Sequence, residues 1–324
     1  MVRILSDAQV ADCLALDDLL PVVREAFLKQ GRGEVERPDR PHFPVGAGLS
    51  GPDPAGTGLV MPAYLHGARF YATKLVGVHE GNADRDLPTV NAQIALTEAE
   101  TGLPAAFLAG TRVTSARTGC IGGLAAAELA DSPVILAVVG AGTQARWQAR
   151  AIAAATDLES VRVYSPSDSK ESCAADLREE LGVPTKAADS PEEAVSGANV
   201  VVTATTATEP VFPGAALDPG TLVVAVGAYT AEMRELDAET FERASRVFAD
   251  VPAEVAEIGD LRGAGVGEEG LVPLSEVFEG RSGRESDDEI LVVESVGTAA
   301  LDAATAEYVF EAAEERGVGT EVSL

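Results

Sequence analysis

Lysine, cysteine and long hydrophobic runs are scarce in this sequence of 324 residues, and each scarcity excludes a class of protein. Four lysines are present, and all lysines and arginines together number 24 against 52 acidic residues. The net charge of −28 is opposite in sign to a nucleic-acid-binding surface. The longest apolar runs, such as 133–139, are far short of the ~20 residues that cross a bilayer. No basic-then-apolar leader opens the chain, so we expect no membrane partner and a cytoplasmic location.

The three cysteines and three histidines form no recognisable site. Cys13, Cys120 and Cys173 have spacings that fit neither a zinc site nor a disulfide framework, and we expect small buried side chains in a reducing compartment. The histidines, at positions 42, 66 and 79, are too scattered to propose as metal ligands, so no metal is expected.

Acidic residues are instead abundant and spread over nearly every segment. A dispersed negative surface that repels itself at low salt is typical of a halophile's protein, and we expect a halophilic archaeal source. The length indicates about two domains, and the 46 % of hydrophobic residues is enough for two cores.

The first third of the chain predicts an α+β unit. Apolar spacing over 8–30 indicates one or two amphipathic helices that end near Gly31 and Gly33. A loop rich in proline and glycine is expected over 37–58, and the β-like segments that follow are 58–64, 69–76, 90–97 and 103–108.

From residue 113 onward the pattern changes. Small residues dominate 113–129, as in a closely packed helix, and strands then alternate with helices. The expected strands are 134–139, 161–164, 200–203, 221–226 and 290–293, the expected helices are 144–155, 169–181, 191–195 and 298–316, and 254–270 is expected to be a loop region. This alternation predicts the α/β class, with a parallel sheet covered by helices on both faces.

A glycine-rich segment between the strand at 134–139 and the following helix is the strongest local signal. It reads Gly140-Ala141-Gly142-Thr143-Gln144-Ala145. Gly140 permits the tight turn, Gly142 lets backbone N–H groups approach a pyrophosphate, and Ala145 allows the helix to pack closely on the strand. This Gly-x-Gly-x-x-Ala in its strand–helix setting predicts a Rossmann-type dinucleotide site.

The end of the next strand indicates which dinucleotide is preferred. Ser165 stands where an acidic residue would accept from the ribose 2′-hydroxyl of NAD. Ser167, Ser169 and Lys170 could serve a 2′-phosphate, whereas Asp168 argues for NAD if the loop folds back. We therefore expect NADP(H) to be favoured over NAD(H).

Three cationic residues are candidates for the substrate side. Lys74 is the only charge in an apolar strand, and a partly desolvated lysine exchanges its proton readily. The alternative is an edge-strand lysine that discourages aggregation. Arg40 and Arg117 carry guanidinium groups suited to a carboxylate, although either could be a surface arginine.

In sequence order, these motifs resemble the ornithine cyclodeaminase/mu-crystallin family over nearly the whole chain. The matching segments are Arg40, Met61-Pro62-Ala63-Tyr64, Thr73-Lys74-Leu75-Val76, Leu87-Pro88-Thr89-Val90, Ala116-Arg117-Thr118, the glycine-rich segment, Ala225-Val226-Gly227-Ala228, Arg234-Glu235-Leu236-Asp237 and Ser295-Val296-Gly297.

The resemblance implies an enzyme that transfers hydride at the α-carbon of an amino acid or its imine. It implies a homodimer with a substrate-binding and dimerisation domain (1–117 with 299–324) and a Rossmann domain (118–298). Substrate would be held by Arg40, Lys74 and Arg117, with Val296 touching it. The implied cofactor-binding residues are Thr89, Arg117, Thr118, Gly140, Ala141, Gly142, Thr143, Gln144, Ser165, Ser167, Thr205, Val226, Gly227 and Ser295.

At two positions this sequence differs from the ornithine cyclodeaminases, and these differences argue against cyclodeaminase activity. Ornithine cyclodeaminases carry a catalytic aspartate where this sequence has Tyr229, and a second acidic residue where it has Leu59. Tyr229 is then a weak acid or only a pocket wall. The mu-crystallin type, a ketimine reductase, also lacks the aspartate, and its pattern resembles Ala207-Thr208-Glu209-Pro210 and Arg234-Glu235-Leu236.

The leading hypothesis is an NAD(P)H-dependent imine reductase whose substrate is a planar 2-imino acid, with the cyclic pyrroline- and piperideine-2-carboxylates as examples. Its catalytic residues would be Lys74, Arg40, Arg117 and Tyr229. The alternatives are an ornithine cyclodeaminase or alanine dehydrogenase, and a non-catalytic protein that binds dinucleotide.

Overall fold

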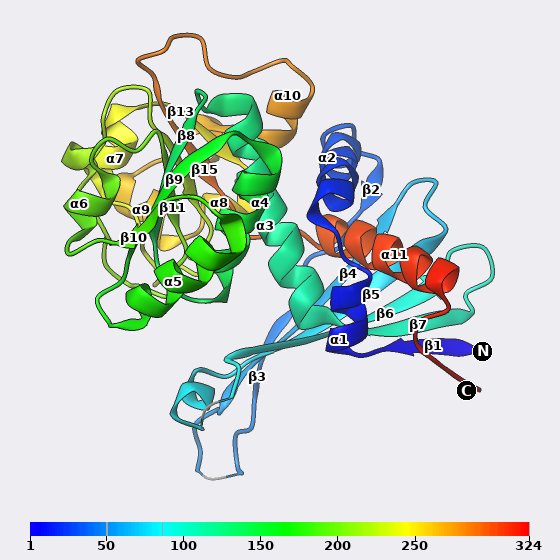
Figure 1. Cartoon of the computed structure of the whole chain (residues 1–324). Helices are drawn as coiled ribbons and strands as arrows, with labels where there is room; N and C mark the ends of the chain where they lie inside the picture. The colour runs from blue at the N-terminus through cyan, green and yellow to red at the C-terminus, as the bar shows by residue number, and fades with distance from the viewer. Residues whose placement is uncertain (50, 86, 324) are drawn as a thin grey trace. The chain divides into compact units, whose positions relative to one another are not determined.

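The computed structural model describes residues 1–49, 51–85 and 87–323 and divides the chain into two compact units (Figure 1). Unit 1 comprises residues 1–117 together with the C-terminal segment that begins at Ala299. Unit 2 is the continuous segment Thr118–Thr298. The described part of the chain contains no helix long and apolar enough to cross a membrane.

Unit 1 is a mixed sheet with helices on one face. The sheet order is β16-β1-β7-β6-β5-β4-β2, with β3 also paired to β4. Strands β4 to β7 form an antiparallel meander, and β1 runs parallel to β7 and antiparallel to β16. The strands are β1 (Val2–Leu5), β2 (Val35–Glu36), β3 (His42–Val45), β4 (Gly56–Leu65), β5 (Phe70–Val78), β6 (Val90–Glu98), β7 (Pro104–Ala109) and β16 (Thr320–Val322).

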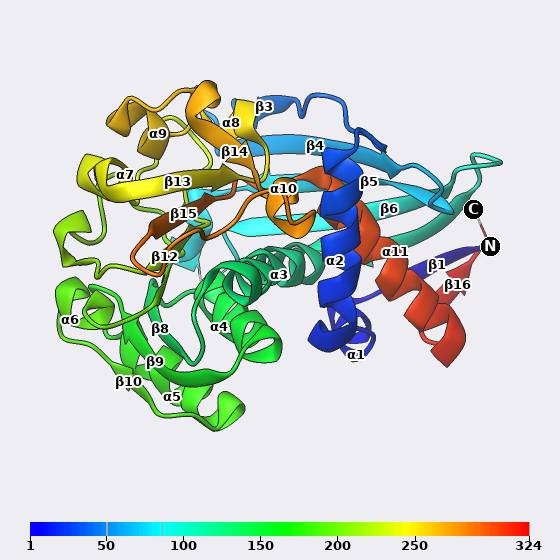
Figure 2. The same ribbon diagram turned by 90° about the horizontal axis from the view of Figure 1, so that it is seen from above.

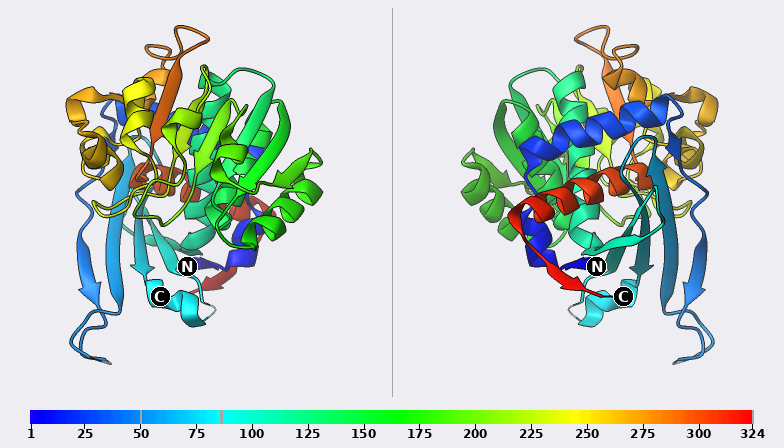
Figure 3. Two further views of the ribbon diagram at one scale, coloured as in Figure 1. Left: turned by 90° about the vertical axis from the view of Figure 1, so that its left-hand side faces the viewer. Right: turned by 90° about the vertical axis from the view of Figure 1, so that its right-hand side faces the viewer.

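Helix α11 (Ala299–Arg316) covers the inner face of this sheet. It packs against β4, β5 and β6 and lies beside α2 (Leu16–Gly31), as the right-hand view of Figure 3 shows. The shorter α1 (Asp7–Asp12) and 3-10 helix η1 (Glu80–Arg85) complete the unit with the first turns of α3 (Gly110–Leu129). Because strand side chains alternate between faces, the residues of β5 that face α11 are buried, whereas Tyr71 and Leu75 point outward.

Unit 2 is built on a parallel sheet of eight strands in the order β10-β9-β8-β11-β12-β15-β13-β14. These strands are β8 (Val134–Val139), β9 (Leu158–Tyr164), β10 (Thr185–Ala187), β11 (Val200–Thr203), β12 (Leu222–Ala225), β13 (Ala244–Ala249), β14 (Leu271–Pro273) and β15 (Ile290–Glu294). Helices α4 (Thr143–Ala155), α5 (Ser169–Leu181) and α6 (Pro191–Val195) follow the first three strands (Figure 2). The remaining helices are η2 (Gly214–Ala216), α7 (Ala238–Arg243), α8 (Pro252–Val255), α9 (Gly259–Ala264), η3 (Glu268–Gly270) and α10 (Leu274–Phe278).

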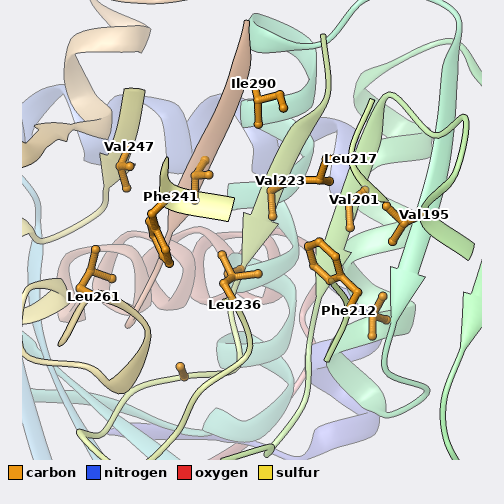
Figure 4. Packing of buried hydrophobic residues seen from close by; sticks show 14 of the residues in the cluster. Val195, Val201, Phe212, Leu217, Val223, Leu236, Phe241, Val247, Leu261 and Ile290 are labelled. Carbon is orange, nitrogen blue, oxygen red and sulfur yellow. The ribbon is translucent and has the colours of Figure 1, made fainter. Parts of the chain in front are cut away.

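The core of unit 2 lies against this sheet. Strands β11, β12 and β15 are buried along their whole length, as expected of parallel strands covered on both faces. Figure 4 shows Phe212, Leu236 and Phe241 in this cluster with Val201 and Val223. Leu236 is therefore anchored in the core, which fixes the neighbouring Glu235.

The α/β fold class predicted from the sequence is confirmed. The predicted ranges of β8, β11, α5 and α6 agree with the structure residue for residue. The prediction of close packing at 113–129 is also confirmed. A Cβ at Gly119 would lie 2.6 Å from the backbone oxygen of Trp147, so only glycine lets α4 approach α3 this closely.

Other predicted segments are wrong. The expected loop at 254–270 contains α9 and η3, because Ile258 and Leu261 turn into the core and order the backbone there. The expected loop at 37–58 contains β3 and the first residues of β4. The pattern also does not predict the short strands β1, β10, β13, β14 and β16. Of these, β1 and β16 exist because the two ends of the chain pair with each other.

Candidate active site

Lys74 lies in the interior of the unit 1 sheet. Its strand, β5, has β4 on one side and β6 on the other, with Met61 and Ile94 as the residues opposite Lys74. The residue is only 2 % exposed. The edge-strand alternative is therefore wrong, because an interior lysine protects no edge and can remain buried only with partners.

The partner is Asp302 of α11. Lys74 Nζ donates to Asp302 Oδ2 at 2.6 Å and to Thr114 Oγ1 at 3.4 Å. Arg117, on α3 and 5 % exposed, donates from Nε to Asp302 Oδ1 at 3.0 Å. One fully buried carboxylate is thus shared by two buried cations, and Arg117 is not a surface arginine.

These charges do not cancel, because Lys74 and Arg117 together carry two positive charges against the one negative charge of Asp302. The pKa of Lys74 is lowered to about 8, because burial and the charges of Arg117 and Arg40 lower it by more than the charge and hydrogen bond of Asp302 raise it. Burial disfavours the Asp302 carboxylate, yet Arg117 and Lys74 outweigh that cost and hold its pKa below the usual range. The half-buried Arg40 therefore adds a third cation to the surroundings of Lys74. A buried excess of positive charge is suited to an anionic ligand such as a carboxylate.

The glycine-rich segment of unit 2 has the geometry of a dinucleotide site. Gly140 has a φ of +122°, and a Cβ there would lie 2.5 Å from Ala204 O, so no other residue fits. Gly142 is the N-cap of α4, and as a glycine it has no side chain to cap the helix; the position that a Cβ would take there is open space. The buried Oε1 atom of Gln144 has no hydrogen-bond partner among the residues that the structure describes. Uncapped amides at the start of a 13-residue helix with open space before them fit a pyrophosphate.

Three serine hydroxyls gather just after β9. Ser165 Oγ lies 3.2 Å from Ser167 Oγ and 3.3 Å from Ser169 Oγ, and Ser167 and Ser169 are 2.7 Å apart. Lys170 Nζ instead donates to Ala188 O at 2.8 Å. The serine hydroxyls that we expect to bind a 2′-phosphate therefore form one cluster, whereas Lys170 is bound to a backbone carbonyl.

Buried carboxylates hold the loops that follow the central strands. Glu235 accepts from Thr203 Oγ1 at 2.9 Å, Thr205 N at 2.7 Å and Gly227 N at 2.8 Å. Burial raises the pKa of Glu235 to about 7, and these hydrogen bonds oppose that rise. The loops after β11 and β12, which carry Thr205, Val226 and Gly227, are thus joined by one side chain.

A second carboxylate holds the loop after β15. Asp250 accepts from Ser295 Oγ at 2.7 Å, Val296 N at 3.2 Å and Gly297 N at 2.8 Å. Glu294, at the end of β15, is fully buried. Burial raises its pKa well above the ordinary value, and the nearby charges of Asp260, Glu235 and Asp250 act in the same direction.

The remaining predicted residues are distributed over both units. Thr89 precedes β6 in unit 1 and its carbonyl accepts from His79 N, and Thr118 in unit 2 accepts from Gln148 Nε2 at 2.8 Å. Tyr229, in the loop after β12, is 36 % exposed, whereas Leu59 is buried on β4. Neither position supplies a carboxylate.

Sequence reasoning missed Asp302 altogether and assigned no role to Glu235 or Asp250. Asp302 lies among the buried apolar residues of α11. An acidic residue at a buried position of an otherwise apolar helix face indicates that a cation or a hydrogen-bond donor pairs with it. The signal for Glu235 was its place in the Arg234-Glu235-Leu236 motif, between a charged residue and a core leucine.

Comparison with known proteins agrees with this geometry. The chain is 35 % identical to a Delta(1)-pyrroline-2-carboxylate/Delta(1)-piperideine-2-carboxylate reductase of Azospirillum brasilense, over 96 % of both chains. It resembles the solved structure of Thermococcus litoralis Delta(1)-pyrroline-2-carboxylate reductase in complex with NADH and L-proline, with a TM-score of 0.93 and 32 % identity over 99 % of this chain and 100 % of the other.

An archaeal alanine dehydrogenase dimer with bound NAD is also similar, with a TM-score of 0.91 and 31 % identity over 99 % of each chain. The model of the ornithine cyclodeaminase/mu-crystallin family matches residues 2–317. The predicted family is thereby confirmed, and this chain belongs to the ornithine cyclodeaminase/mu-crystallin family.

Proposed function

We propose that this protein is an NAD(P)H-dependent imine reductase that acts on a cyclic 2-imino acid, pyrroline-2-carboxylate or piperideine-2-carboxylate. The observation that carries the proposal is the cluster of Lys74, Arg117 and Asp302, whose net positive charge is buried in unit 1. The reductases of Azospirillum and Thermococcus, which are similar along the whole chain, support the same substrate class.

The residues of unit 1 bind and protonate the substrate. Arg40 and Arg117 hold its carboxylate, and the shared Asp302 keeps Arg117 and Lys74 oriented. A bound NADH or NADPH would supply the hydride for the imine carbon, as the two-electron reductant. Lys74 Nζ gives one proton to the imine nitrogen, so the C=N bond becomes an amine, and Lys74 regains a proton from solvent. A lysine pKa near 8 suits this exchange, because the group is mostly protonated at neutral pH yet releases its proton readily.

The residues of unit 2 hold the dinucleotide. The amides that begin α4 receive the pyrophosphate, and the loops that carry Thr205, Val226, Gly227 and Ser295 line the cofactor. NADPH is preferred over NADH, because the hydroxyls of Ser165, Ser167 and Ser169 stand where an acidic residue would repel a 2′-phosphate.

The active form is a homodimer that pairs the outer face of the unit 1 sheet. Ile4, Phe107, Ala95 and Thr73 stand opposite one another in a row on that face. Ile4 and Phe107 are 44 % and 41 % exposed, and Leu75 nearby is 42 % exposed. A contiguous exposed apolar face is typical of an interaction surface, and the similar alanine dehydrogenase is a dimer.

A second candidate is alanine dehydrogenase activity, which the similarity to the archaeal alanine dehydrogenase favours. Ornithine cyclodeamination is less well supported, since Leu59 and Tyr229 replace the two acidic residues expected for it. Given the charge of −28, the protein works best at high ionic strength, as a halophile's cytoplasmic protein would.

A spectrophotometric screen tests these assignments. The purified protein is assayed in high salt, with NADH and with NADPH, against pyrroline- and piperideine-2-carboxylate, pyruvate plus ammonia, and ornithine. Oxidation of NADPH by the cyclic imines is expected. Turnover of pyruvate plus ammonia alone would favour alanine dehydrogenase, and tight NADPH binding without any turnover would identify a non-catalytic binding protein.

A further inference from the structure

Glu235 connects the two loops of unit 2 that follow β11 and β12. Its Oε1 accepts from Thr205 N in the first loop, and its Oε2 accepts from Gly227 N in the second and from Thr203 Oγ1 at the end of β11. Ligands of parallel α/β sheets bind outside the carboxyl ends of the strands. The carboxylate of Glu235 therefore lies behind the backbone that would face a dinucleotide bound at this edge of the sheet.

Hydrogen bonds also hold the backbone of Glu235 and of the next residue, Leu236, in place. Asp260 Oδ1 accepts from Glu235 N and from Leu236 N, both at 2.7 Å. Glu235 O accepts from Val211 N at 2.8 Å, and Leu236 is fully buried in the core. Glu235 consequently has little freedom to move, and the two loops take their positions from it.

The same close contacts require glycine at two positions of the site. A Cβ on Gly227 would collide with Thr205 O and would lie 2.6 Å from Glu235 Cδ, so the second loop fits only because residue 227 has no side chain. The loop after β11 also contacts the glycine-rich segment. Its first residue, Ala204, donates from N to Val139 O at 2.9 Å, and Ala204 O packs against Gly140. Glu235 thus influences the pyrophosphate segment through one intervening loop.

We propose that Glu235 is a positioning residue for the dinucleotide: its buried carboxylate holds the loops after β11 and β12 in the conformation that contacts the cofactor. This inference rests on the proposed function, because it requires unit 2 to bind NADH or NADPH. It gives a physical role to the glutamate of the Arg234-Glu235-Leu236 motif. Glu235 acts through the two loops and touches no reacting atom.

The test compares Glu235→Gln with a matched variant, Asp237→Asn. A glutamine keeps one acceptor oxygen, but its amide group would face two donors, Gly227 N and Thr203 Oγ1. Asp237 also accepts backbone bonds, from Gly214 N and Thr240 N at 2.8 Å, yet it holds η2 and α7 rather than a loop at the carboxyl end of a strand. The two variants therefore lose similar hydrogen bonds in the same segment.

Dissociation constants for NADH and NADPH are measured by nicotinamide fluorescence, and KM values are measured for dinucleotide and for imine. Both variants are expected to lower the Tm. Glu235→Gln is expected to raise the dinucleotide Kd and KM about tenfold while the KM for imine changes less than about twofold, and Asp237→Asn is expected to leave the Kd unchanged. Equal Kd values for Glu235→Gln and wild type would overturn the inference, since a merely structural role would move only the Tm.

A second variant keeps the test decisive if Glu235→Gln does not fold. Thr203→Val preserves the shape of a buried strand residue and removes one donor to Glu235. An increase of about threefold in the dinucleotide Kd supports the inference, and an unchanged Kd contradicts it. A wild-type protein that binds neither dinucleotide would refute the proposed function together with this inference, whereas normal wild-type turnover with an unaffected Glu235→Gln refutes the inference alone.

Discussion

Lys74 and Asp302 are 228 positions apart in the sequence, yet Lys74 Nζ lies 2.6 Å from Asp302 Oδ2, and both side chains are almost fully buried. The contact ties the centre of β5 to the first turn of α11. Because Asp302 also accepts from Arg117 Nε, its carboxylate orients both buried cations.

Lys74→Ala should reduce kcat/KM for pyrroline-2-carboxylate by at least about a hundredfold, the usual size of a lost proton donor. The dinucleotide Kd should change little, because Lys74 belongs to unit 1. Steady-state kinetics with NADPH provide the measurement. Lys186→Ala is the matched control, since Lys186 pairs with Glu193 on the surface of unit 2. Unchanged turnover in Lys74→Ala would refute the assigned role.

Asp302→Asn should destabilise the protein and impair catalysis together. Removing the Asp302 carboxylate leaves Lys74 and Arg117 buried without their shared counter-charge, which costs about 3–5 kcal/mol of unfolding free energy. Urea unfolding measures the loss. Asp7→Asn is the control, because Asp7 pairs with Arg112 on the surface at 2.6 Å and should unfold close to wild type. Wild-type stability in Asp302→Asn would mean that the cluster is not charged as described.

The kcat/KM for imine reduction should fall tenfold per pH unit above about pH 8, where Lys74 loses its proton. The effect on stability has the opposite sign. The pKa of Lys74 is lowered in the folded chain from its ordinary 10.5, so between about pH 8 and 10.5 the unfolded chain binds more protons, and the contribution of this group to stability rises with pH.

A pH profile of kcat/KM, recorded beside thermal unfolding over the same range, therefore separates deprotonation from unfolding. In Asp302→Asn the decline should begin at a lower pH, because both the charge and the hydrogen bond of Asp302 raise the pKa of Lys74. A rate that increases above pH 8 would instead assign Lys74 the role of a base.

Ser165→Asp should reverse the dinucleotide preference from NADPH toward NADH. A carboxylate at the end of β9 accepts from a ribose 2′-hydroxyl and repels a 2′-phosphate. The ratio of kcat/KM for the two dinucleotides is the measurement. Ser196→Asp, at an exposed position after α6, adds the same charge elsewhere in unit 2 and should leave that ratio unchanged. A wild-type protein that prefers NADH would already contradict the assignment.

Leu75→Glu should convert a dimer to a monomer, because it places a charge in the exposed apolar face of the unit 1 sheet. Sedimentation velocity in high salt measures the oligomeric state. Ala175→Glu, on the exposed side of α5, adds the same charge outside that face and should not alter it. A wild-type monomer, or a Leu75→Glu dimer, would show that this face is not the interface.

Local patterns predict the regular parts of the fold and only some of the site. The apolar strand 134–139, the glycines after it and the helix that follows identify the dinucleotide loop, because each depends on neighbours within a few residues. The same patterns do not predict α9 or β13, whose order comes from contacts such as that of Leu261 with the core. Lys74 stood out as a lone charge, but its burial in an interior strand depended on which strands become its neighbours.

The sequence alone therefore determined the α/β class, the glycine-rich segment and the family, and it singled out Lys74 and Arg117 as unusual cations. Only the tertiary structure decided which acidic side chains pair with these cations and which hold the loops of unit 2. Asp302 reaches Lys74 and Arg117 because α11 returns to the sheet of the first residues, and Glu235 joins two loops because β11 and β12 are adjacent in the sheet. These contacts join segments that are far apart in the sequence, so they depend on how the segments pack. A local pattern of neighbouring residues cannot predict them.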